Sequence, residues 1–180
     1  MNNKFIKFSA IILAILAVLA VFPLFRDKMS NGSDKKTENV SVNMSGFTKE
    51  TASKLVIKKG NDEKILSFKD NKWLIGENEA DEEKINQLFK DFADLKIKEM
   101  ASNNEENWRK FEVTKDSGYQ LTITQDGKDN TFFIGKSGSS VNDFFIRKEG
   151  IKNVYLANGE LKNKMAWENE KWKKTAEDKK

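Results

Sequence analysis

The triplet Gly135, Lys136 and Ser137 has the residue types that end a phosphate-binding loop. Such a loop also needs an earlier glycine, so that successive backbone N–H groups can curl round the phosphates at the start of a helix. Asn130 or its neighbour Thr131 takes that place here, and the residues that follow, "SGSSVND", predict a turn into another strand. We therefore predict a hairpin loop rather than a nucleotide site.

Two other patterns have simpler structural explanations. Ser33 and Lys36 have the spacing of a serine nucleophile and its lysine base, but they lie in a stretch without periodicity, where nothing would hold a nucleophile in place. Asp81, Glu82 and Glu83 open a predicted helix, where acidic side chains interact favourably with the N-terminal end of the helix dipole. We expect no metal site and no catalytic residue in either stretch.

The composition excludes several classes of site. The chain has no cysteine and no histidine, which removes thiolate metal sites, disulfides and the commonest general base near neutral pH. Lys and Arg number 32 and Asp and Glu 28, and the two signs alternate along most of the chain. Only Arg26, Arg109 and Arg147 supply guanidinium groups, whereas nucleic-acid readers rely on arginine. We expect no bound cofactor and no nucleic-acid partner.

The run from Phe8 to Phe25, "FSAIILAILAVLAVFPLF", carries no charge and approaches the length needed to span a bilayer core. Lys4 and Lys7 precede it. We predict a leader over 1–7 and a transmembrane helix over 8–25 that anchors the chain in the lipid bilayer. The alternative is a signal peptide cut after Ala20; the apolar run continues past that site, which favours the anchor.

A short basic leader before the first apolar segment is typical of a signal anchor, and long following domains are exported largely regardless of charge. We therefore expect a single-pass protein of the bacterial cytoplasmic membrane, with its carboxy-terminal domain outside. Residues 26–51, rich in Ser, Asn, Lys and Thr, predict a flexible tether.

Residues 52–174 predict one globular domain, followed by a polar tail over 175–180. The runs "SKLVIKK", "KILSFKD" and "KWLI" predict a β-meander with turns at Gly60-Asn61 and Asp70-Asn71. "DEEKINQLFKDFADL" changes to helical spacing, with Asp81 as the N-cap. "KIKEMA" predicts a further strand and "NEENWRKF" a short helix.

The second half predicts more strands. "YQLTITQ" alternates apolar and polar residues, and Asp126-Gly127 after it is a strong hairpin signal. "NTFFIG", "NDFFIRK" and "NVYLA" supply three further strands, and "ELKNKM" a final helical turn. The predicted fold class is α+β: antiparallel β-meanders packed against one main amphipathic helix, preceded by one transmembrane helix.

The order of several motifs resembles a known family. "FFIGK", "FFIRKEG", "VYLANGEL" and "EKWKK" follow one another as in the carboxy-terminal half of the bacterial domain of unknown function 4340. The resemblance extends upstream through "KLVIKKG", "KDNKWLI" and "ADEEKINQLF", and so covers Ala52 to Lys174. It implies an α+β domain, often behind one membrane segment and sometimes found in auxiliary subunits of gliding-associated ABC transporters. It implies no activity.

Four residues are candidates for an interaction surface: Lys136, Arg147, Tyr155 and Trp172. Each also has a structural explanation. Lys136 in a Gly-Ser loop would be solvated, Arg147 would pair with a carboxylate, and Tyr155 would cap the core. Trp172, like Trp73 and Trp108, would pack in the core or at its rim.

These observations favour a non-catalytic, membrane-tethered domain that binds or scaffolds an envelope protein partner. Two alternatives stay open. One is an accessory subunit of an ABC-type transporter, which would co-purify with membrane-embedded partners. The other is a cell-wall enzyme that uses carboxylates alone, which requires two acids across a cleft.

Overall fold

The computed structural model describes residue 44 and residues 46–175 of the chain. The predicted leader, the anchor over 8–25, most of the tether and nearly all of the polar tail lie outside these residues. Among the residues described, none of the helices has both the length and the apolar character needed to cross a membrane.

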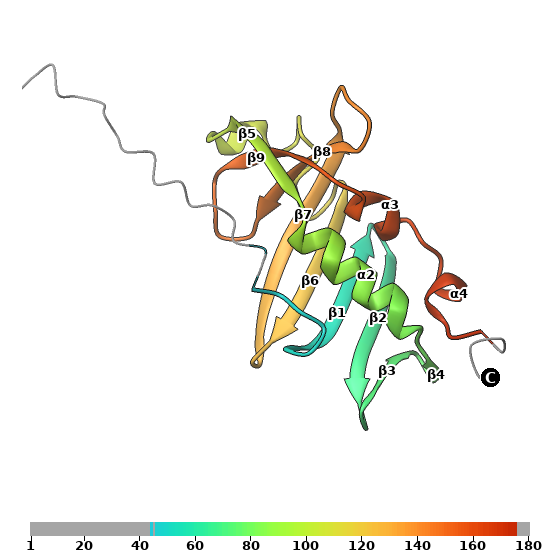
Figure 1. The fold of residues 1–180 in the computed structure, drawn as a ribbon. Helices are drawn as coiled ribbons and strands as arrows, with labels where there is room; N and C mark the ends of the chain where they lie inside the picture. The colour runs from blue at the N-terminus through green and yellow to red at the C-terminus, as the bar shows by residue number, and fades with distance from the viewer. Residues whose placement is uncertain (1–43, 45, 176–180) are drawn as a thin grey trace, which may run out of the picture. The chain divides into compact units, whose positions relative to one another are not determined.

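The described domain is built on one antiparallel sheet, with strand order β4-β3-β2-β1-β6-β7-β8-β9-β5 (Figure 1). The strands are β1 (Ala52–Lys59), β2 (Asp62–Lys69), β3 (Lys72–Ile75), β4 (Asn78–Glu79), β5 (Lys96–Ser102), β6 (Tyr119–Gln125), β7 (Lys128–Ser137), β8 (Asp143–Lys148) and β9 (Val154–Asn158). Two meanders, β1 to β4 and β6 to β9, meet at the β1–β6 pair, where Leu55 lies opposite Ile123. The two predicted meanders are thus confirmed as parts of one sheet.

The predicted turns form where residues tolerate positive φ. Asp70 and Asn71 have φ of 50° and 61°, and Asp126 and Gly127 have φ of 51° and 70°. Each pair forms the two-residue turn between consecutive antiparallel strands, β2 and β3 or β6 and β7. Positive φ at both turn residues is typical of primed hairpin turns. The turn chemistry therefore sets the register of both meanders.

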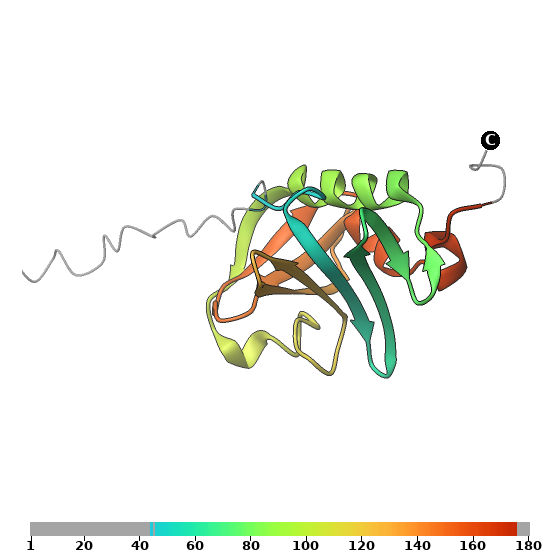
Figure 2. The same cartoon turned by 90° about the horizontal axis from the view of Figure 1, so that it is seen from below.

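Helix α2 (Glu82–Ala93) covers one face of the sheet (Figures 1 and 2). The Asp81 carboxylate accepts hydrogen bonds from the backbone N–H groups of Glu83 and Lys84, at 3.0 and 3.3 Å, which confirms the predicted N-cap. The apolar stripe of the helix is buried and consists of Ile85, Leu88, Phe89 and Phe92. The helix follows β4 at one edge of the sheet and leads to β5 at the other edge.

The main core lies between α2 and the sheet. The ring of Phe92 packs edge-on against that of Phe132 on β7, with the ring centroids 4.8 Å apart. Phe47 contacts both rings, each at 5.7 Å, and Met44 is also buried. Both residues fall in the predicted tether, so the packed domain begins earlier than the expected boundary at residue 52. Their burial beside α2 is the physical reason.

The opposite face of the sheet is covered around β7, β8 and β9 by the segment 103–118. This segment was expected to hold a short helix and contains one turn of 3-10 helix, η1 (Glu105–Asn107). Val113 from the segment forms a second apolar cluster with Phe133 and Val154, and Trp108 and Phe111 pack against it. The domain therefore has apolar packing on both faces of its second half.

Two short helices close the chain. α3 (Leu161–Met165) confirms the predicted last helical turn, whereas α4 (Asn169–Trp172) was not predicted. Trp172 is fully buried, and its carbonyl oxygen accepts a hydrogen bond from the backbone N–H of Asp81 at 2.8 Å. The C-terminal segment thereby contacts the start of α2.

Candidate functional site

The four candidate surface residues do not form one surface. Arg147 and Tyr155 are 4% and 8% exposed, and Trp172 is fully buried. Arg147 lies on the face of the sheet covered by the segment 103–118, whereas Tyr155 and Trp172 belong to the main core with α2. Lys136 is half-buried, with its ammonium group 5.9 Å from the centre of the Phe111 ring. The structure corrects the expected surface, because three of its four members pack inside.

Arg147 holds the covering segment to the sheet. Its guanidinium carbon lies 3.7 Å from the centre of the Trp108 ring and 4.4 Å from that of Phe133. Its Nε donates to the carbonyl oxygen of Val113 at 3.1 Å, and its Nη1 donates to that of Ile151 at 3.4 Å. A cation between two ring faces is attracted to both, and the carbonyls satisfy its donors. Arg147 thus has a structural role, built from rings and carbonyls and not from the expected carboxylate.

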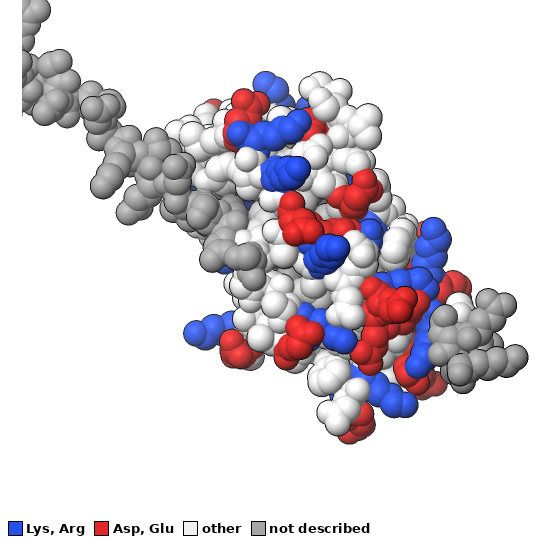
Figure 3. Space-filling model, viewed as in Figure 1, with Lys and Arg blue, Asp and Glu red and all other residues white. Residues whose placement is uncertain are grey.

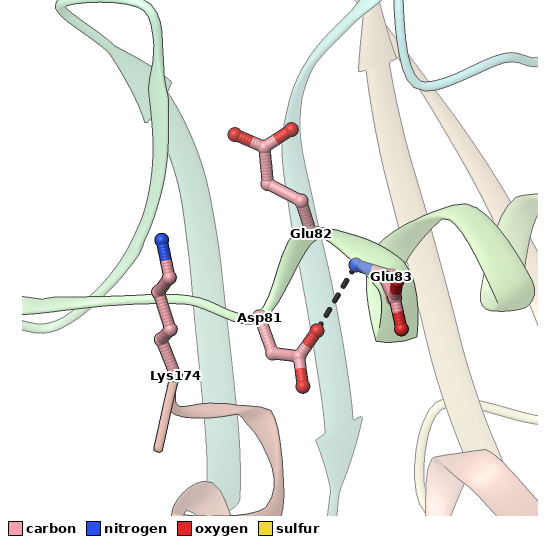
Figure 4. Close-up of a pocket in the computed structure, with 4 residues that line it drawn as sticks. All are labelled: Asp81, Glu82, Glu83 and Lys174. Atoms are coloured by element: carbon pink, nitrogen blue, oxygen red, sulfur yellow. Dashed lines mark hydrogen bonds between the residues drawn. The ribbon is translucent and has the colours of Figure 1, made fainter. Parts of the chain in front are cut away.

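The acidic residues at the start of α2 border a hollow of about 380 Å³ together with Lys174. Figure 4 shows that the carboxylates of Asp81, Glu82 and Glu83 point in different directions and not toward one point. Asp81 pairs with Lys84 at 2.5 Å and caps the helix. Within the described part of the chain, no group of three or more Asp and Glu side chains converges to hold a metal ion.

Ion pairs hold two of the other charged groups that line this hollow, Glu82 and Lys174. Glu82 pairs with Lys49 at 2.8 Å, and Glu79 pairs with Lys174 at 2.9 Å and with Lys72 at 3.4 Å. The hydrogen bonds from Lys174 and then Lys72 lower the pKa of Glu79. A general acid needs a raised pKa, so Glu79 is unsuited to that role near neutral pH. The ion pairs around this hollow therefore connect the C-terminal segment with the strand and helix start beside it.

A second hollow, of about 240 Å³, lies where the loop after β7 faces α3, and we call it the β7–β8 hollow. Its polar lining consists of Ser137, Ser140, Asn142, Asp143, Lys162 and Asn163. The strand β7 ends at Ser137 and the chain turns directly into β8, so the Gly-Lys-Ser triplet belongs to a hairpin, as predicted. The hollow thus takes its residues from that hairpin and from the last part of the chain.

Lys162 is the cation of the β7–β8 hollow. Its Nζ donates to the Ser137 hydroxyl oxygen at 3.0 Å. Burial lowers the pKa of Lys162, Glu112 raises it, and Lys59 lowers it further. In the ion pairs found among the described residues, Lys162 does not take part. The hydrogen-bond partner of this cation is therefore a neutral hydroxyl group.

Asp143 forms the buried wall of the β7–β8 hollow. Its side chain is 1% exposed and pairs with Lys98 of β5 at 2.8 Å. The amide of Asn158 donates to its Oδ1 at 2.7 Å. These hydrogen bonds, first from Lys98 and then from Asn158, lower the pKa of Asp143, with a smaller contribution from Ser140. The negative charge of the wall is thus compensated inside the protein.

Glu112, which interacts electrostatically with Lys162, has a strained backbone, with φ of 58°. The chain is crowded here: a Cβ on Gly135 would lie 2.0 Å from the carbonyl oxygen of Phe111, and one on Gly118 would lie 2.4 Å from that of Glu112. Glycine is required at both positions for this close approach. A positive φ at a non-glycine residue is unfavourable, and the packing around Glu112 must offset it.

Sequence reasoning missed Lys162. The lysine lies in a short helix, in a part of the chain rich in lysine, and no local pattern distinguishes it from Lys164 or Lys171. Its partner Ser137 is 25 residues away in sequence. The pairing of β7 with β8 and of β8 with β9 brings the two segments together.

The family comparison agrees with the resemblance seen in the motifs. Residues 73–177 match the family model described as "Domain of unknown function (DUF4340)", from within β3 to beyond α4. Neither the search of curated proteins nor the search of solved structures found a match. Because the family model covers more than half of the chain, the protein belongs to the DUF4340 family.

Proposed function

We propose that the chain is a membrane-tethered domain of the bacterial cell envelope that binds another envelope component without catalysis, with the folded domain outside the cytoplasmic membrane. The observation that carries the proposal is the uncharged run over residues 8–25, which precedes the folded domain after a basic leader. The fold, an antiparallel sheet under one main helix, is the body held by this anchor.

The contacts of the charged groups support the non-catalytic part of the proposal. Glu79, Asp81 and Glu82 beside the start of α2 pair with lysines. Arg147 holds the covering segment. On the face viewed in Figure 3, basic and acidic side chains are interleaved rather than gathered by sign. Groups committed to such pairs stabilise the fold and are poorly placed to transfer protons to a substrate.

Fractionation of cells that express the full chain tests the anchor. We expect the uncut product in the membrane fraction, and its release by the double change Leu16→Arg and Leu19→Arg, since each arginine at the centre of a span costs roughly 2.5–3.5 kcal/mol. Lys4→Gln, which changes the leader and leaves the run intact, is the matched control. A shorter, freely dissolved product would show instead that the segment is a cleaved signal peptide.

Protease added to intact spheroplasts tests the orientation. We expect digestion of the folded domain, whereas complete protection would reverse the topology. Crosslinking in intact cells, followed by identification of the captured protein, then tests the binding role. A membrane-embedded transporter subunit recovered in constant ratio with the chain would favour the transporter alternative over a scaffold.

A further inference from the structure

The β7–β8 hollow contains a cation whose environment is incomplete. Burying an ammonium group is unfavourable unless it is paired. Lys164, in the same helix α3, is paired with Asp91 at 2.5 Å. Lys162 has the Ser137 hydroxyl at 3.0 Å as its hydrogen-bond partner. The two lysines lie in the same helix, but Lys164 pairs with a carboxylate and Lys162 with a neutral hydroxyl.

The donors around Lys162 are arranged for an acceptor. An ammonium group carries three N–H donors, and one of them is directed to Ser137. Because the Ser137 oxygen accepts that bond, its own hydroxyl hydrogen is available to a second acceptor. A group placed in the hollow could therefore receive hydrogen bonds from both side chains.

Two carboxylates lie at the hollow: Asp143, and Glu160, which accepts hydrogen bonds from the lining amides of Asn142 and Asn163. In the ion pairs of the described residues, neither is the partner of Lys162. Asp143 is already bound by Lys98 and Asn158, so it does not neutralise Lys162. Lys59 adds a second positive charge close enough to disfavour the protonated form of Lys162, while Glu112 partly opposes it. Burial lowers the pKa of Lys162, and a bound anion would raise it again by favouring the charged form.

We propose that the β7–β8 hollow binds a single oxyanion group, a phosphate or a carboxylate, through Lys162 Nζ and the Ser137 hydroxyl. A volume of about 240 Å³ admits such a group and a few attached atoms, not a whole polymer. Lysine binds oxyanions as a point charge, and a neighbouring hydroxyl adds direction. This site adds a place and a ligand class to the binding role proposed above. It rests on that proposal only in taking the ligand to come from the cell envelope.

The test uses the full-length protein in detergent micelles. Inorganic phosphate and acetate are titrated in separate arms at constant ionic strength, and the backbone amide NMR signals of Ser137, Ser140 and Asn163 are followed. We expect saturable shifts in at least one arm. Lys162→Met should weaken the apparent affinity at least tenfold, and Ser137→Ala should weaken it less. Lys128→Met, at the exposed hairpin between β6 and β7, should leave it unchanged.

A third arm adds phosphatidylglycerol to neutral micelles, with phosphatidylcholine as its control, and so distinguishes a lipid-borne phosphate from a free one. Shifts that do not saturate in any arm, or that are equal in the wild type and Lys162→Met, would overturn the site. The titration does not depend on where the protein lies in the cell. Failure of the membrane anchor and failure of the oxyanion site are therefore separate results.

Discussion

Arg147 and Lys162 are both basic side chains whose pKa is lowered by burial, yet their surroundings differ. Arg147 lies between the rings of Trp108 and Phe133 and donates to backbone carbonyls. Lys162 donates to one hydroxyl and borders a hollow. A buried cation is therefore not in itself a sign of a binding site. What distinguishes the two regions is whether the protein already supplies the partners of the charge.

The largest effect is expected at Arg147. Arg147→Met should lower the free energy of unfolding by about 3 kcal/mol, because it removes two desolvated cation–π contacts and leaves the Val113 carbonyl oxygen without its donor. Urea denaturation measures the change. Arg147→Lys keeps the charge but loses the planar fork, and it should cost about 2 kcal/mol.

A loss below about 0.5 kcal/mol in Arg147→Met would contradict the structural role and make the two cations equivalent. Such a result would also restore Arg147 as a candidate for a binding surface.

The ring above Arg147 should matter next. Trp108→Leu removes one cation–π contact and the hydrogen bond from the indole N–H to the carbonyl oxygen of Lys152, found at 3.0 Å. We expect a loss of about 2 kcal/mol in the free energy of unfolding. Trp108→Phe keeps a ring face and should lose about half as much. Equal losses in both variants would show that the ring face contributes little.

The sequence predicted local structure, such as strands, turns and helix caps, better than it predicted contacts between distant segments. Alternation along β6 and the Asp126-Gly127 pair predicted the hairpin, because strand faces and turn φ angles are properties of neighbouring residues. The N-cap at Asp81 was predictable for the same reason. The order of the motifs then indicated the family, which the family model confirmed.

Contacts between distant segments were not predictable. β5 pairs with β9 at the far edge of the sheet only because α2 carries the chain across it. The role of Arg147 depends on how the segment 103–118 folds over the sheet, and the segment has little regular structure. Lys162 and Ser137 meet through the same kind of non-local packing. Strand β4, with two residues, is too short to produce a periodic signal.

Lys162 should have a small effect on stability, in contrast to Arg147. Lys162→Met removes a partly buried charge without a counter-ion and fills similar space with an apolar chain. We expect the free energy of unfolding at neutral pH to stay the same or rise, by about 0.5 kcal/mol at most. A loss above about 1 kcal/mol in urea denaturation would show that the hydrogen bond to Ser137 is a structural contact, and would weaken the contrast with Arg147.

The smallest and most specific expected effect is how the difference in unfolding free energy between the wild type and Lys162→Met changes with pH. Because burial lowers the pKa of Lys162 from its ordinary 10.5, the unfolded chain binds this proton more tightly than the folded chain does. The wild type should therefore gain stability relative to Lys162→Met as the pH rises from the folded pKa toward 10.5. Lys59 and Glu112, which face Lys162, are present in both proteins, so the difference isolates this lysine. Unfolding midpoints at pH 7, 9 and about 10.5 measure it. If the wild type instead lost stability relative to Lys162→Met as the pH rises, Lys162 would be stabilised as a cation inside the protein and would need no anion from outside.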